Sequence, residues 1–98
     1  MTKAGILDFI RSNKTFLQSH FFVKTIGIFG SYAQDKASEN SDIDFLIEFE
    51  DGDLDIYSLK QNLKEFLQKK LGKRIDIANP KYLKPFVKNK ILDSAIYA

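Results

Sequence analysis

The feature that most constrains this chain is segment 42–49, in which polar and apolar side chains alternate. Successive side chains of a strand point to opposite faces of a sheet, so this alternation predicts a strand with one apolar face. The apolar positions are Ile43, Phe45, Ile47 and Phe49. Asp42 and Asp44 lie on the opposite face, together with Leu46 and Glu48. Two carboxylates on one side of a strand cannot both be buried without a partner, so they need solvent or a cation beside them.

The remaining sequence predicts further short elements around this strand. Helices are predicted over 3–18, 31–35, 56–71 and 82–93. The longer ones follow from apolar side chains at helical spacing, and the short one from its place after a glycine turn. Strands are predicted over 23–29, 42–49 and 74–78. Thr2 is expected to cap the first helix, and Gly72 to end the third. Pro85 is compatible with the last helix because it falls in the first turn.

This order of elements predicts an α/β (α+β) fold, with a small mixed β-sheet and helices packed on one face. The 98 residues, of which 44% are hydrophobic, are enough for a single domain covering 1–98. The absence of cysteine excludes disulfides and thiolate zinc sites. No apolar run approaches the ~18 residues that a membrane helix needs, so we expect a soluble, cytoplasmic protein without membrane contact.

Charge is distributed unevenly along the chain. Residues 35–55 carry nine acidic side chains and one basic side chain, Lys36. From Lys60 onward there are ten lysines or arginines and three acids. A basic stretch can attract phosphate-rich ligands, although most such stretches are solvated faces. The acidic stretch is more informative because its carboxylates are regularly spaced.

A third carboxylate is predicted to join the first two. Asp76 lies opposite Ile75 and Ile77 on the predicted strand 74–78. If this strand packs beside 42–49, three carboxylates meet and raise one another's pKa unless a cation neutralises them. Magnesium prefers oxygen ligands and often completes its shell with substrate phosphates. The sequence therefore predicts a magnesium site formed by Asp42, Asp44 and Asp76.

A glycine turn upstream of the carboxylates has the features of a phosphate-binding site. The strand 23–29 runs into Gly30 and Ser31, where a short helix is expected. Glycine allows close approach of a ligand to the backbone, and free amide groups at a helix start favour an anion. The Ser31 hydroxyl can donate a further hydrogen bond to a phosphate oxygen. Alone, Gly-Ser and Asp-x-Asp are both common, so it is their combination that indicates a nucleotide site.

These residues together resemble a known family. The run Gly30-Ser31-Tyr32-Ala33, with ten positions from Tyr32 to Ser41 between Ser31 and the segment Asp42-Ile43-Asp44-Phe45, is similar to the signature of the minimal nucleotidyltransferases (MNT) of the DNA polymerase β superfamily. The segment 74–77 resembles the strand that carries that family's third carboxylate. The resemblance covers most of the chain, from about Val23 onward.

The resemblance implies a function for each motif. Gly30 and Ser31 would bind the triphosphate of ATP or another nucleoside triphosphate, and Asp42 and Asp44 would hold two Mg²⁺ ions. Asp76 would join one metal and help to activate the acceptor hydroxyl. The implied reaction is two-metal transfer of a nucleoside monophosphate, most simply AMP, to a partner protein. Some members are antitoxins of HEPN-domain toxins, so the resemblance also implies a HEPN partner.

One departure keeps alternatives open. Family members often continue the signature as Ala-Arg-Gly, whereas this chain has Ala33-Gln34-Asp35. The second hypothesis is therefore an inactive or weakly active antitoxin that neutralises a HEPN ribonuclease by binding alone. A third, addition of nucleotides to nucleic-acid ends, draws on the basic second half but lacks a domain to grip the strand. The sequence does not predict the donor base, the acceptor or the oligomeric state.

Overall fold

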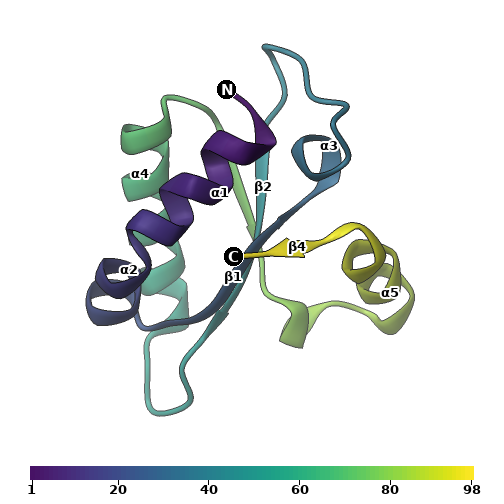
Figure 1. Cartoon of the computed structure of the whole chain (residues 1–98). Coiled ribbons are helices and arrows are strands. Elements are labelled where there is room, and N and C mark those ends of the chain that lie inside the picture. The colour runs from purple at the N-terminus through teal and green to yellow at the C-terminus, as the bar shows by residue number, and fades with distance from the viewer.

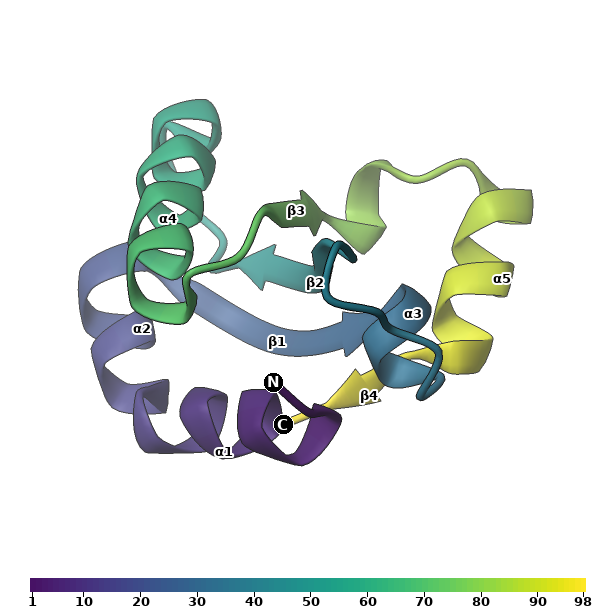
Figure 2. The same ribbon diagram turned by 90° about the horizontal axis from the view of Figure 1, so that it is seen from above.

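A computed structural model describes all residues from 1 to 98. Four strands form one sheet in the order β3-β2-β1-β4, seen in Figure 2. They are β1 (Val23–Phe29), β2 (Ile43–Phe49), β3 (Ile75–Ala78) and β4 (Ile96–Tyr97). β2 and β3 are parallel, and β1 is antiparallel to both β2 and β4. The predicted α/β class and the small mixed sheet are confirmed.

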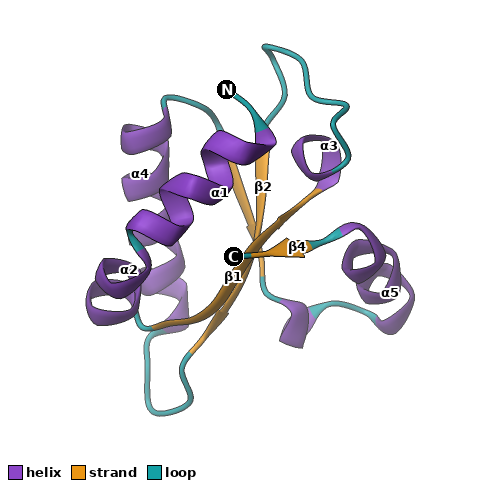
Figure 3. Cartoon of the chain, viewed as in Figure 1, coloured by secondary structure: helices purple, strands orange, loops and turns teal.

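The helices follow the predicted pattern with two differences (Figure 3). They are α1 (Lys3–Ser12), α2 (Lys14–Phe21), α3 (Gly30–Ala33), α4 (Ile56–Leu71) and α5 (Pro85–Ser94). The predicted helix 3–18 is two helices, because the chain turns at Asn13, whose side-chain amide donates to the Phe9 carbonyl at 2.8 Å. The predicted helix 82–93 begins only at Pro85, after the short 3₁₀ turn η1 (Pro80–Tyr82). Proline disfavours helical backbone in the residue before it, so Pro85 is the first helical residue.

The caps of the long helices agree with the sequence. Thr2 accepts a hydrogen bond from the Gly5 amide at the start of α1. At the start of α4, Asp55 accepts one from the Ser58 amide. Gly72 ends α4 with φ of +66°, a left-handed conformation that glycine adopts without steric cost. These caps fix where α4 ends and β3 begins, and they thereby position Asp76 on β3.

The hydrophobic core lies on the apolar side of β2. Ile43, Phe45 and Ile47 are fully buried there against apolar residues of α1, α2 and α4. These three helices cover one side of the sheet as expected, whereas α5 lies on the other side (Figures 1 and 2). None of the residues of α5 is buried, and Phe86 is 73% exposed. The polar side of β2, which carries Asp44, therefore faces the more open side of the molecule.

The two-residue strand β4 was not predicted. It pairs with β1 through Gly27 and Ile28. A Cβ atom at Gly27 would lie 2.5 Å from the carbonyl oxygen of Ile96, so only glycine allows this approach.

No helix is both long enough and apolar enough to span a bilayer.

Candidate active site

The strand pairing brings two of the predicted site residues side by side. β2 and β3 are parallel neighbours, and their register pairs Asp44 with Asp76. Both residues lie on the side of the sheet away from the core, because their neighbours Ile43, Phe45 and Ile75 are buried on the other side. Asp44 is half-buried, whereas Asp76 is exposed. The sequence prediction that these two carboxylates come from adjacent strands is confirmed.

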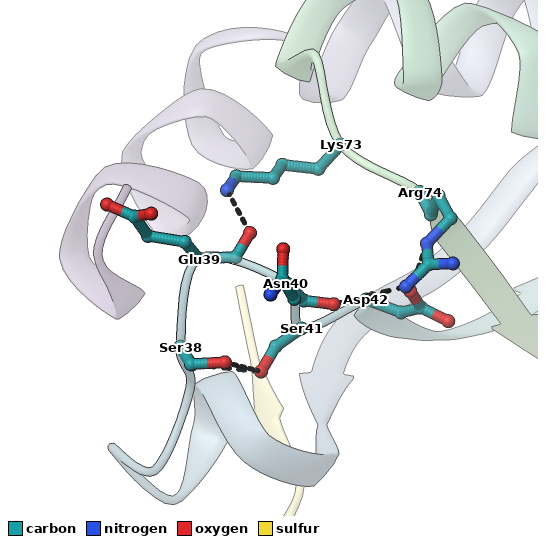
Figure 4. A network of polar contacts seen from close by, with 7 residues as sticks. All are labelled: Ser38, Glu39, Asn40, Ser41, Asp42, Lys73 and Arg74. Carbon is teal, nitrogen blue, oxygen red and sulfur yellow. Dashed lines mark hydrogen bonds and ion pairs between the residues drawn. The ribbon is translucent and has the colours of Figure 1, made fainter.

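Asp42 lies one residue before β2 and has a charged partner of its own (Figure 4). Its carboxylate oxygen Oδ1 lies 2.9 Å from Nε of Arg74, the residue before β3. The side chain of Asp42 is 45% exposed and that of Arg74 is 76% exposed. Arg74 also donates from Nη2 to the carbonyl oxygen of Asn40 at 3.1 Å. The sequence predicts Asp42 as a metal ligand but does not predict its contact with this arginine.

The carboxylates act on one another electrostatically. Partial burial, followed by the charges of Asp76 and then Asp42, raises the pKa of Asp44 from 3.8 to about 6. All three causes penalise the ionised form of Asp44. The site therefore concentrates negative charge that a bound cation would relieve.

Gly30 lies directly against Asp44, which places the predicted phosphate turn beside the carboxylates. Gly30 has φ of +71°, and a Cβ atom there would overlap the Asp44 carboxylate and lie 3.1 Å from its Cγ. The close approach of the Asp44 side chain therefore requires glycine at this position, in addition to any role that Gly30 has toward a ligand. Ser31 follows in α3, which Tyr32 and Ala33 anchor in the core.

The position that departs from the family signature has a structural explanation. Asp35 adopts φ of +58°, which lies in the left-handed region of backbone angles. It stands at the position where the family signature has glycine. Its carboxylate pairs with Nζ of Lys3 at 2.8 Å. The turn after α3 is therefore left-handed at Asp35, and Lys3 neutralises the charge of this residue. Gln34 and Asp35 supply no cation to this turn.

The donor set fits a hard divalent cation. Asp42, Asp44 and Asp76 offer only carboxylate oxygens, which magnesium prefers. Oδ1 of Asp42 is buried but forms no aligned hydrogen bond, even though Nε of Arg74 lies nearby. The three side chains do not converge as a preformed metal centre, however. Their assignment as ligands of two Mg²⁺ ions stays a prediction.

Comparison with known proteins gives a consistent family. The family model described as a nucleotidyltransferase domain matches residues 10–98. A candidate protein adenylyltransferase of Methanocaldococcus jannaschii is 36% identical over 97 residues, covering 98% of this chain and 97% of that protein. The protein adenylyltransferase MntA of Thermococcus cleftensis is 34% identical over 99 residues, covering 99% of this chain and 96% of that protein.

Solved structures share the fold. A candidate minimal nucleotidyltransferase aligns with a TM-score of 0.79 at 30% identity, covering 98% of this chain and 95% of that one. A toxin-antitoxin complex with AMP-PNP gives 0.68 at 21% identity, with coverage of 99% and 72%. A tri-AMPylated Shewanella oneidensis HEPN toxin in complex with MNT antitoxin gives 0.58 at 18% identity, with coverage of 97% and 66%. At these lower identities, the two complexes establish likeness of fold.

Proposed function

This chain belongs to the nucleotidyltransferase domain family, and we propose that it transfers AMP from ATP to a hydroxyl group on a partner protein. The observation that carries the proposal is the pairing of Asp44 with Asp76 across β2 and β3, directly beside Gly30. The names of the two archaeal relatives support a protein as acceptor. The complex with AMP-PNP supports an adenine nucleotide as donor.

Each site residue has a distinct task in this reaction. The turn at Gly30 and Ser31 binds the triphosphate through its amide groups and hydroxyl. Mg²⁺ ions held by Asp42, Asp44 and Asp76 would make the attacking hydroxyl more acidic and neutralise the leaving pyrophosphate. Asp76, the exposed carboxylate, orients that hydroxyl and accepts its proton. The acceptor oxygen forms a bond to the α-phosphorus, and the bond from that phosphorus to the bridging oxygen breaks, releasing pyrophosphate.

We further propose that the acceptor is a HEPN-domain toxin and that the chain acts as its antitoxin. The motivating observation is the shared fold with the MNT antitoxin that is bound to an AMPylated HEPN toxin. Transfer of AMP to the toxin adds a charged, bulky group to a surface hydroxyl and would block the toxin's function. The exposed position of Asp76 is compatible with access of a protein hydroxyl.

Labelling of the partner tests this function directly. The purified chain is incubated with α-labelled ATP, magnesium and the partner toxin, and label on the toxin is measured. The double variant Asp42→Asn with Asp44→Asn should lose the label, as should wild type treated with EDTA. The double variant Asp51→Asn with Asp53→Asn, an equal charge change on the exposed turn after β2, is the matched control and should retain it. Label that persists in the double variant would remove these carboxylates from the mechanism.

Neutralisation by binding alone is the second candidate function. It is favoured by the turn after α3, where Asp35 is bound to Lys3 and Gln34 stands in place of the arginine of the family signature. The double aspartate variant distinguishes the two functions when it is expressed in cells beside the toxin. If the variant still protects the cells, binding is sufficient. If protection is lost while the complex can still be isolated, transfer of AMP is required.

A further inference from the structure

Two consecutive basic residues between α4 and β3 hold the loop that leads into the site (Figure 4). Nζ of Lys73 donates to the carbonyl oxygen of Glu39 at 2.8 Å. Arg74 donates to the carbonyl oxygen of Asn40 and also contacts Asp42. Both residues therefore tie the same loop, but only Arg74 reaches a carboxylate of the site. This difference makes Lys73 a natural control for Arg74.

The contact between Arg74 and Asp42 is close but poorly bonded. Nε lies 2.9 Å from Oδ1, yet Oδ1 has no aligned hydrogen bond. Oδ1 itself is buried, but the Asp42 side chain is 45% exposed and that of Arg74 is 76% exposed, so water around the pair screens it and keeps it weak. Arg74 also lines an open hollow between residues 39–41 and 72–74, which gives the guanidinium room to turn away. A divalent cation brings twice the charge and could displace it.

We propose that Arg74 occupies the Asp42 carboxylate in the metal-free protein and competes with the divalent cation for it. This inference rests on the proposed function, because it takes Asp42 as a metal ligand. Arg74 partly offsets the charge of Asp42 while no cation is bound. The cation must then displace Nε to reach Oδ1, so Arg74 weakens the metal affinity of the site. Arg74 is a positioning residue in this account, since it acts through Asp42.

Binding of Mn²⁺ to the full chain without nucleotide, followed by electron paramagnetic resonance, tests the competition. Arg74→Gln should bind Mn²⁺ about two- to fivefold more tightly than wild type, the range that an exposed ion pair supports. Lys73→Gln removes the same charge and also releases the loop, but it leaves Asp42 engaged, so its gain should be clearly smaller. Arg74→Lys keeps the charge without Nε and should fall between wild type and Arg74→Gln. It also carries the test if Arg74→Gln does not fold.

Three outcomes separate the possible errors. Unchanged or weaker Mn²⁺ binding in Arg74→Gln and Arg74→Lys would overturn the competition, since Arg74 would then be neutral or would hold Asp42 ready for the metal. An equal gain in Lys73→Gln would also overturn it, because net charge alone would explain the effect. If Asp42→Asn binds Mn²⁺ as well as wild type, Asp42 is not a ligand, and the proposed metal site itself fails.

Discussion

Replacing Asp44 with asparagine should stabilise the fold at neutral pH while abolishing transfer. The folded-state pKa of Asp44 is raised from 3.8 to about 6, so the folded protein binds this proton more tightly than the unfolded chain does. The stability from this group is fully present below pH 3.8 and is lost as the pH rises through about 6. At ~1.36 kcal/mol per pH unit, the difference corresponds to ~3 kcal/mol at most. Because Asp44 is only half-buried, screening by solvent should reduce it to about 1–2 kcal/mol.

Urea unfolding of wild type and Asp44→Asn at pH 4.5 and pH 7.5, without divalent cations, measures this effect. The stability of the variant relative to wild type should rise by about 1–2 kcal/mol between the two pH values. Asp53→Asn, on an exposed turn, should show no such change and controls for the loss of one charge. The difference in free energy of unfolding between Asp44→Asn and wild type could instead stay constant with pH or fall as the pH rises. Either result would refute the raised pKa of this carboxylate.

Three further substitutions test the packing around the site. Gly30→Ala should destabilise the fold by about 1–3 kcal/mol in urea unfolding, because alanine is strained at positive φ and its methyl group overlaps the Asp44 carboxylate; an unchanged midpoint would contradict this. Leu63→Ala removes a fully buried side chain of α4 and should lower the free energy of unfolding by about 2–5 kcal/mol in the same assay. A loss below ~1 kcal/mol would show that the core closes around the shortened side chain. Lys3→Ala should cost less than about 1 kcal/mol in thermal unfolding, since its pair with Asp35 is exposed; a loss of ~2 kcal/mol or more would mean that this pair fixes the turn.

The sequence predicted those parts of the fold that depend on local periodicity. The alternation in 42–49 gave the two faces of β2, and the spacing of apolar residues up to Gly72 gave α4 with its C-terminal cap. Asp44 and Asp76 could be placed together because side-chain direction on a strand follows from position alone. The breaks at Asn13 and Pro85 were harder to place, since helical spacing of apolar residues continues across short turns.

Features that depend on contacts between distant segments were not predictable in the same way. The pairing of β4 with β1 joins segments far apart in the sequence, and its one local signal is the glycine at position 27 within a strand. The contact between Arg74 and Asp42 depends on how the loop before β2 meets the end of α4. The sequence predicts a phosphate-binding role for Gly30, whereas the structure also requires a glycine there because of the Asp44 carboxylate. In each case the local sequence does not identify the distant segment that makes the contact.

Asp42, Asp44 and Asp76 are proposed to hold divalent cations beside the Gly30 turn. A crystal structure with Mn²⁺ and an ATP analogue that has a non-cleavable bond between the α- and β-phosphorus tests this claim most directly, because anomalous scattering locates manganese. Anomalous peaks are expected within coordination distance of all three carboxylates, with the triphosphate against Gly30 and Ser31. Manganese bound elsewhere, or a nucleotide placed away from these carboxylates, would contradict the account.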